Sequence, residues 1–332
     1  MEAPPPAPAP TNDALPFTGE RFVPGTPGEI WVEHWHRYHF AARWTAGKRV
    51  VDVACGEGYG SALLARGAAS VTGIDVSEAA IAHARRTYAD VPNLQLVRAS
   101  CDALPLADAS VDVAVSFETL EHIAEQAAFL DELARVLAPG GVLVLSCPNK
   151  REYSDERSHV NEFHVKELYR EELAALVSAR FPESDWYGQR PTFYSMIAPE
   201  APAAAVGQVV EVEEADPVNA RPALSRPLYF LVAASRERSA LDAVPRALSV
   251  LADRGDWVYR DYENTYRKLR QAEIGIEGLQ AQLQEGHRVL QQREAEIVAR
   301  GLQLSERNRE IVRRRGWRAW LRLPLERLGL LK

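Results

Sequence analysis

Between residues 50 and 147 the chain alternates short apolar runs with segments of helical pattern. The apolar runs are RVVDVAC, SVTGIDV, LQLVRAS, VDVAVSF and GVLVLSC, and the segments between them include SALLARG, EAAIAHARRTY and FLDELARVLA. Strands that alternate with helices of about ten residues predict βαβ units and a mostly parallel sheet. Because the runs are apolar throughout, we expect helices to cover both faces of the sheet.

The charge balance limits the partners of this α/β domain. The chain has 332 residues and a net charge of −7, which does not favour binding to nucleic acid. Residues 300–332 hold ten Lys/Arg against three Asp/Glu, so this tail carries +7 and the remainder −14. A basic tail on an acidic body indicates a local anionic partner, such as a membrane surface.

Three cysteines, Cys55, Cys101 and Cys147, show no CxxC spacing and are expected to pack as small apolar residues at strand ends. The first 14 residues lack the basic and apolar regions of a signal peptide, and no apolar run reaches 18 residues. We therefore expect a cytoplasmic protein.

The organisation expected along the chain has five parts. They are a disordered Pro/Ala-rich leader (1–14), the α/β domain (15–236), a helical connector (237–255), a coiled coil (256–312) and a basic amphipathic tail (313–332). Within the domain, a polar insertion at 198–223 is either a lid or a dispensable loop.

The coiled coil is predicted from a stripe of residues at strict intervals of seven. Its members are Tyr262, Leu269, Ile276, Leu283, Leu290, Ile297, Leu304 and Ile311. Such a repeat requires supercoiling and favours a homo-oligomer, although one helix lying on its own domain is the alternative. The position three residues after each stripe residue would be the second contact position of the coiled coil. In the second half of the repeat it is poorly suited to this, because it is occupied by Gly286, Arg293, Arg300 and Arg307.

The tail mixes Trp317 and Trp320 with leucine and arginine, a composition typical of a helix lying in a membrane interface. Peripheral attachment to the inner face of a membrane follows, and docking on protein is the alternative.

A ligand site is predicted where the first apolar run ends. The glycines are spaced Gly56-x-Gly58-x-Gly60, whereas a dinucleotide fingerprint needs G-x-G-x-x-G and position 61 is serine. Asp52, just before them, would repel a pyrophosphate but suits a cationic ligand with an ammonium and a sulfonium. Asp75 ends the second run, where a carboxylate can accept hydrogen bonds from ribose hydroxyls.

These motifs, with Ser100–Pro105 after the third run and VDVAVSFETLEHI as the fourth, resemble those of class I S-adenosylmethionine-dependent methyltransferases over residues 20–235. The resemblance implies a Rossmann-like, doubly wound sheet of seven strands with the last strand antiparallel, followed here by the long helix. It also implies bound S-adenosylmethionine and methyl transfer. The cofactor-binding residues it implies are Tyr38, Asp52, Ala54, Cys55, Gly56, Gly58, Asp75, Val76, Asp102, Ala103, Leu104 and Phe117.

The flanking segments 18–24, 33–38 and 161–168 look like those of methyltransferases from bacterial polysaccharide and O-antigen assembly, which implies a sugar or glycan acceptor. The aromatic residues Trp31, Trp35, Tyr38 and Trp44 either stack on a sugar face or pack a helix over the cofactor. The alternatives are a small-molecule methyltransferase of secondary metabolism and a coiled-coil scaffold with a vestigial domain.

Catalysis requires a base for the acceptor, and histidine side chains titrate near neutral pH. His122 is the first candidate, with His164 and Glu118 beside it and His159 as a rival. The arrangement Glu118-x-x-Glu121-His122 also resembles the metal-binding E-x-x-E-H of certain O-methyltransferases, where His164 adds a fourth ligand to an ion such as Mg²⁺. The same string is common in relatives with no known metal, so we expect no metal.

Overall fold

The computed structural model describes residues 29–158, 160–192, 211–213, 216–221, 224, 226–251 and 257–330. The expected leader, the segment 18–24 and His159 lie outside the described residues. The chain divides into two compact units between Val258 and Tyr259, and each is described by itself.

The first unit is built on a sheet of seven strands in the order β3-β2-β1-β4-β5-β9-β6. The strands are β1 (Arg49–Val53), β2 (Ser70–Asp75), β3 (Leu94–Arg98), β4 (Val111–Phe117), β5 (Leu137–Pro148), β6 (Glu183–Gln189) and β9 (Tyr229–Ser235). Strands β1 to β5 are parallel, and β9 is antiparallel to both of its neighbours. This confirms the predicted Rossmann-like sheet with its last strand antiparallel.

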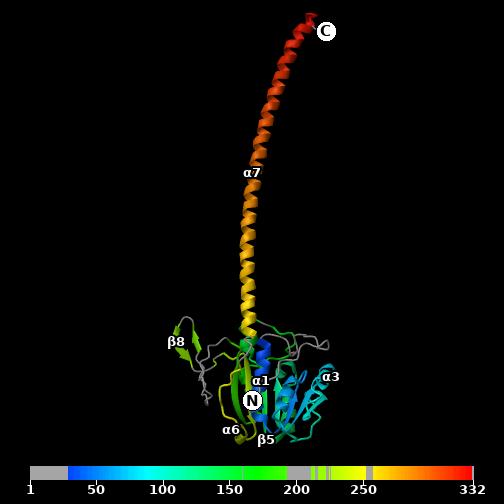
Figure 1. Ribbon diagram of the computed structural model, residues 1–332, viewed down its shortest axis with the longest axis vertical. Coiled ribbons are helices and arrows are strands. Elements are labelled where there is room, and N and C mark those ends of the chain that lie inside the picture. The colour runs from blue at the N-terminus through cyan, green and yellow to red at the C-terminus, as the bar shows by residue number, and fades with distance from the viewer. Residues whose placement is uncertain are drawn as a thin grey trace. The chain divides into compact units, whose positions relative to one another are not determined.

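Helices cover both faces of the sheet, as its apolar strands require (Figure 1). Helices α1 (Glu29–Thr45) and α2 (Tyr59–Ala65) contribute to one apolar core, and α4 (Gln126–Val136) and α5 (Arg170–Ser178) to the other. Neighbouring residues of one strand enter different cores, because successive side chains point to opposite faces. Val50 lies in the first core and Val51 in the second.

Two shorter helices complete this unit. Helix α3 (Glu78–Thr87) packs on β2 and β3, where Ile81, Ala84 and Leu96 form a small core with Cys55. Helix α6 (Arg238–Asp242) follows β9, and residues 243–251 of the expected helical connector are irregular.

The residues Pro139-Gly140-Gly141 lie inside β5 and do not form a turn between α4 and β5. The helix instead joins the strand directly at Leu137, which pairs with Val111. The register then shifts, so that Val113 pairs with Val142. A side chain at Gly141 would lie 2.9 Å from the carbonyl oxygen of Ala138, so a glycine suits this bulge.

The insertion expected at 198–223 contains a small hairpin of β7 (Glu211–Glu213) and β8 (Asp216–Arg221). The segments before and after this insertion both form an ion pair with the same buried carboxylate. Glu152 accepts from Arg190 at 3.3 Å and from Arg226 at 3.1 Å.

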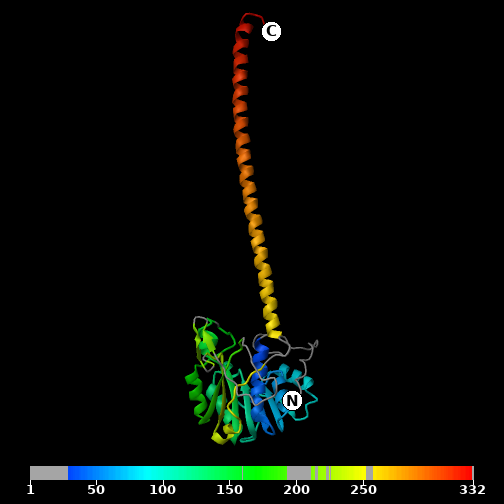
Figure 2. The ribbon, with the colours of Figure 1, turned by 60° about the vertical axis from the view of Figure 1, so that its left-hand side comes forward.

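The second unit consists of α7 (Trp257–Arg327), a single continuous helix in both views (Figures 1 and 2). It includes the predicted coiled coil and most of the predicted tail, and Pro324 lies in its last turn. None of the helices of the described residues is long and apolar enough to cross a membrane.

The close packing at Gly60 leads to the first prediction. A Cβ atom there would lie 2.0 Å from the ring of Tyr38, which is held between Tyr59 and Phe117. We expect Gly60→Ala to lower the free energy of unfolding by about 1–3 kcal/mol, the usual cost of overpacking. Chemical denaturation measures this loss. Gly67→Ala is the matched control, because nothing lies within 4 Å of its added Cβ. Equal losses in the two variants would contradict the packing argument.

Candidate functional site

The loop after β1 has a backbone that few side chains allow. Ala54, Gly56 and Gly58 have φ values of 62°, 55° and 78°, all in the left-handed region. Glycine adopts this region freely, whereas alanine does so only when the surroundings hold it there. The loop ends where α2 begins at Tyr59, so its backbone is presented at the start of a helix, as in nucleotide-binding loops.

Asp75 fixes this loop to the end of β2. Its Oδ2 accepts from the backbone N–H of Gly56 at 2.9 Å, and its Oδ1 accepts from that of Ser77 at 2.8 Å. A carboxylate has about four acceptor positions, so Asp75 keeps capacity for two ligand hydroxyls. The neighbouring Val76 is an apolar side chain that is 66% exposed, which suits contact with a flat apolar ligand.

Asp52 is placed differently from the side chains that line the loop. Its carboxyl is fully buried under α1 and α2, where it accepts from the Ser61 hydroxyl at 2.6 Å and from the Tyr38 hydroxyl at 3.2 Å. Burial raises the pKa of Asp52 to about 7, against the lowering effect of these two hydrogen bonds. Asp52 therefore supports Tyr38 and α2 from inside the domain.

The segments that follow β3 and β4 lie at the same side of the sheet, where the parallel strands end; we call this side the carboxyl edge, or simply the edge. Asp102 and Ala103 are exposed, whereas the side chain of Leu104 is buried in the second core. The backbone N–H of Leu104 donates to Glu132 at 2.8 Å. Phe117, at the end of β4, meets the ring of Tyr38 edge to face at 5.1 Å.

The order β3-β2-β1-β4 thus brings most of the predicted cofactor residues to adjoining strand ends. Two of them, Asp52 and Leu104, turn their side chains into the interior, and Cys55 is buried in the small core under α3. The aromatic residues of α1 also pack inward, since Tyr38 and Trp44 are buried in the first core.

The other half of the edge carries a row of rings. The guanidinium of Arg37 lies 4.2 Å from the ring centroid of Tyr229, and Tyr229 lies 5.9 Å from Tyr153. Tyr153, from the single helical turn η2 (Arg151–Asp155), stacks on His164 at 5.4 Å, and His164 meets His122 at 5.0 Å. These residues form a continuous aromatic wall, which we call the ring wall.

Carboxylates accompany the ring wall. Glu33 accepts from the hydroxyl of Tyr229 at 3.0 Å. Glu118 follows β4 with φ at 48°, accepts from the Ser146 hydroxyl at 2.7 Å, and lies 3.8 Å from the buried guanidinium of Arg37. Arg37, Tyr229 and Glu33 are buried, whereas the three other rings of the wall and Glu118 are partly exposed. The exposed part can therefore present ring faces and a carboxylate to hydroxyls of a ligand.

The two candidate histidines differ in which ring nitrogens are engaged. His122, at the end of the turn η1 (Leu120–His122), places Nδ1 2.9 Å from the carbonyl oxygen of Phe163. A carbonyl only accepts, so in the neutral ring Nδ1 carries the proton and Nε2 carries the lone pair. In His164, Nδ1 donates to Glu167 at 2.6 Å, and Nε2 accepts from the side-chain amide of Asn161 at 2.9 Å.

The possible metal ligands are partly assembled. One ligand atom each of Glu121, His122 and His164 lies within 4.8 Å of the others, and Glu118 is not part of this group. Burial raises the pKa of Glu121 well above its ordinary value, and the nearby Glu118 raises it further. Both ring nitrogens of His164 are engaged within the protein, and a hard cation such as Mg²⁺ prefers oxygen ligands to imidazole nitrogen.

Sequence reasoning did not find Arg37, Glu33 or Tyr229 as site residues. Arg37 is 1% exposed, and its Nε donates to Gln189 at 2.7 Å. A buried arginine at that place could not be inferred, because its partners come from β4, β6 and β9, far apart in sequence.

Comparisons with known proteins indicate the family of this chain. A family model described as a methyltransferase domain matches residues 51–145. A probable S-adenosylmethionine-dependent methyltransferase of Mycolicibacterium smegmatis is 40% identical over 207 residues, covering 60% of this chain and 77% of that one. A similarly described protein of Mycobacterium tuberculosis is 40% identical over 181 residues, covering 52% of this chain and 64% of that one. A ubiquinone biosynthesis O-methyltransferase of Psychrobacter arcticus is 41% identical over 110 residues, covering 32% and 42%.

These relatives imply S-adenosylmethionine as the cofactor. The half of the site at the ends of β1, β2, β3 and β4, which we call the donor half, fits this cofactor. The left-handed glycine loop brings its backbone close to the place of the methionyl part, Asp75 has acceptors left for the ribose, and Val76 is exposed for the adenine. Asp102 is exposed at the end of β3, where it can accept from the adenine amino group.

Asp75 leads to the second prediction. We expect Asp75→Ala to weaken binding of S-adenosylhomocysteine by roughly 2–3 kcal/mol, because it removes charge-assisted hydrogen bonds to the ribose and to Gly56. Isothermal titration calorimetry measures this loss, with the exposed Asp90→Ala as control. NAD should bind far more weakly than S-adenosylhomocysteine to the unmodified protein. Tight NAD binding without binding of S-adenosylhomocysteine would overturn the cofactor assignment.

Proposed function

Because the chain belongs to the S-adenosylmethionine-dependent methyltransferases, we propose that it transfers the methyl group to a hydroxyl of a sugar or glycan. The observation that supports this proposal is the partly exposed part of the ring wall, formed by Tyr153, His164 and His122, with Glu118 beside it. Apolar ring faces and carboxylate acceptors together suit a ring that bears several hydroxyls.

The chemical step requires positioning and the removal of one proton. The bound cofactor supplies a methyl group on a positively charged sulfur, and the acceptor oxygen attacks it in line. We propose His122 as the base, since its Nε2 carries a lone pair while the carbonyl of Phe163 holds the ring in place. Glu118 would accept a hydrogen bond from the acceptor, and His164, held by Glu167, would support the ring of His122.

A hydroxyl acceptor on a small molecule is the second candidate. It is favoured by the similarity to a ubiquinone biosynthesis O-methyltransferase, although that match covers only 32% of this chain. This candidate would have no need of α7, whereas a glycan carried on a lipid would.

The distal end of α7 supports an acceptor at a membrane. Exposed apolar side chains at Trp320, Leu323 and Leu328 lie among the arginines of residues 313–327. A helix with this composition binds at the interface of an anionic membrane, and apolar burial and charge attraction act together. We propose that this tail holds the enzyme near a lipid-linked glycan.

The third prediction tests the acceptor and the base. Incubation of the protein with labelled cofactor and lipid-linked glycans should transfer label to a sugar hydroxyl, located by mass spectrometry. We expect His122→Gln to lower turnover about 10²–10⁴-fold because the base is lost. EDTA should leave activity unchanged.

The exposed His39→Gln is the control for this variant and should retain activity. Label on free small molecules but on no glycan would favour the second candidate. Loss of activity with EDTA that Mg²⁺ or Mn²⁺ restores would replace the base by a metal site.

The fourth prediction concerns the tail. The full chain should co-sediment with vesicles containing anionic lipid, and added salt should weaken this binding because the attraction is partly ionic. Replacement of Trp317 and Trp320 by alanine should remove most of the affinity for these vesicles. The unmodified full chain should not bind vesicles of neutral lipid. Equal binding by a chain ending at residue 312 would place the membrane contact elsewhere.

A further inference from the structure

The apolar stripe of α7 is exposed along its whole length among the described residues. The same helix contains interior glycines at 275, 278, 286, 301 and 316, each with nothing within 4 Å of an added Cβ. Each glycine costs about 1 kcal/mol relative to alanine, so propensity alone does not support a helix of this length. A stable α7 therefore requires something that covers the stripe.

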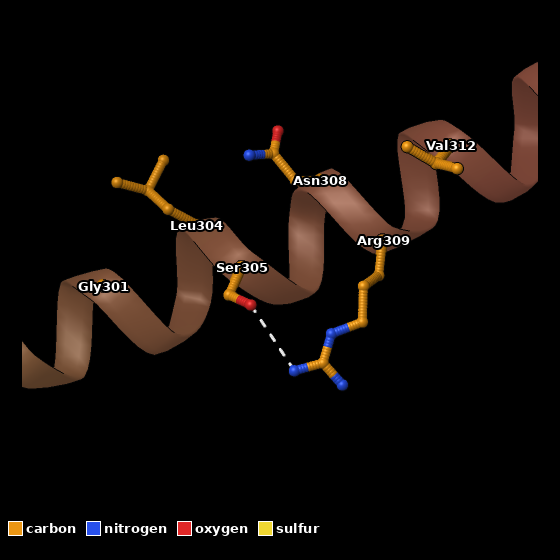
Figure 3. Close-up of a pocket in the computed structure, with 6 residues that line it drawn as sticks. All are labelled: Gly301, Leu304, Ser305, Asn308, Arg309 and Val312. Carbon is orange, nitrogen blue, oxygen red and sulfur yellow. Dashed lines mark hydrogen bonds between the residues drawn. The ribbon is translucent and has the colours of Figure 1, made fainter.

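One shallow hollow lies on the exposed surface of α7. It is lined by Gly301, Leu304, Ser305, Asn308, Arg309 and Val312 (Figure 3). The first four are spaced i, i+3, i+4 and i+7, and four residues of a facing helix make such a hole for an inserted side chain. Gly301 widens this hole because it has no side chain.

The hollow assigns the coiled-coil register of the distal half of α7. Ile297, Leu304 and Ile311 alternate with Gly301 and Asn308 at spacings of four and three, so the stripe occupies heptad position d and the other two residues occupy a. Arg293, Arg300 and Arg307 then fall at g, beside the contact. If the stripe occupied position a, these arginines would stand at d inside the contact.

Glu294 occupies position a one heptad before Gly301, so we propose that the contact begins after it: residues 297–312 pair with the same segment of a second copy of this chain, parallel and in register. In that arrangement a d residue enters the hole made by positions a, d, e and the next a. The hole of Gly301, Leu304, Ser305 and Asn308 is therefore the one that receives Leu304 of the partner subunit.

Asn308 is the reason for the parallel orientation. In a parallel pair it meets Asn308 of the partner subunit, and the two amides can hydrogen-bond to each other; one asparagine at position a is known to fix register in this way. In an antiparallel overlap of the same segments, Asn308 would be buried against an apolar residue. This proposal stands apart from the proposed acceptor, since it concerns α7 alone.

The fifth prediction compares two leucines of equal exposure. Leu304 is 63% exposed and Leu302 is 62% exposed, but only Leu304 lies in the proposed contact. In analytical ultracentrifugation the full chain should be a dimer. Leu304→Asp should raise the dissociation constant at least about tenfold, since it buries a charge in the contact, and Leu302→Asp should not. Both variants should keep the binding of S-adenosylhomocysteine of the unmodified protein.

Orientation is tested by oxidation. In the parallel register, Asn308→Cys should form a disulfide between subunits, and Arg309→Cys, one residue along, should not. A monomeric full chain, or equal effects of the two leucine variants, would overturn the proposal. A dimer in which Asn308→Cys fails to cross-link would also overturn it, because the copies would then not be parallel and in register.

Discussion

The buried carboxyl of Asp52 is the interaction on which the donor half of the site depends. It comes from the middle of the sheet and joins α1 through Tyr38 and α2 through Ser61. Tyr38 can reach it only because Gly60 leaves room for its ring. The three elements that frame the glycine loop are thereby held to one group, whose pKa of about 7 reflects its burial. Each hydroxyl offsets part of the cost of taking a carboxylate out of water.

Two of the four described non-glycine residues with left-handed φ lie at the neighbouring ends of β1 and β4, which pair in the sheet. Ala54 and Glu118 follow these strands with φ of 62° and 48°, and neither is glycine. Such residues cost about 1–3 kcal/mol each and persist only when their surroundings hold them. Here the backbone N–H of Cys55 donates to Ile74 and that of Glu118 donates to Ser146. The strained pair lies where the donor half and the ring wall meet, so rigid strands fix the two halves of the site against each other.

The parallel part of the sheet and the positions of Asp75 and the glycine loop could be predicted from local patterns, whereas the seven strands and the antiparallel last strand were implied by the family resemblance. Apolar runs identify strands that are covered on both faces, and the residue that ends each run comes to one edge of the sheet. Asp75 was found in this way, and the structure ties it to the loop through Gly56.

Asp52 shows where this reasoning fails. Its closeness to the glycines suggested contact with the ligand, but alternation along β1 turns its side chain to the face under α1. The ring wall could not be predicted, because it joins residues of α1, η1, η2 and β9 that only the folded sheet brings together. A seven-residue period likewise does not show which residues beside the stripe, three or four positions after each stripe member, join a helix contact.

The residues that suit a helix contact lie on different sides of the stripe in the two halves of α7. In the proximal half Ala272 and Leu279, three residues after stripe members, suit the contact, whereas in the distal half Gly301 and Asn308, four residues after stripe members, do so. If the contact shifts from the first set of residues to the second, successive contact positions near His287 are separated by three, four, four and three residues. This spacing is the pattern of a stutter. A stutter locally unwinds a supercoil, and a straight helix drifts about 20° per heptad from a seven-residue repeat. The proposed pairing covers the distal stripe residues Ile297, Leu304 and Ile311, and it leaves Arg300 and Arg307 at the edge of the contact.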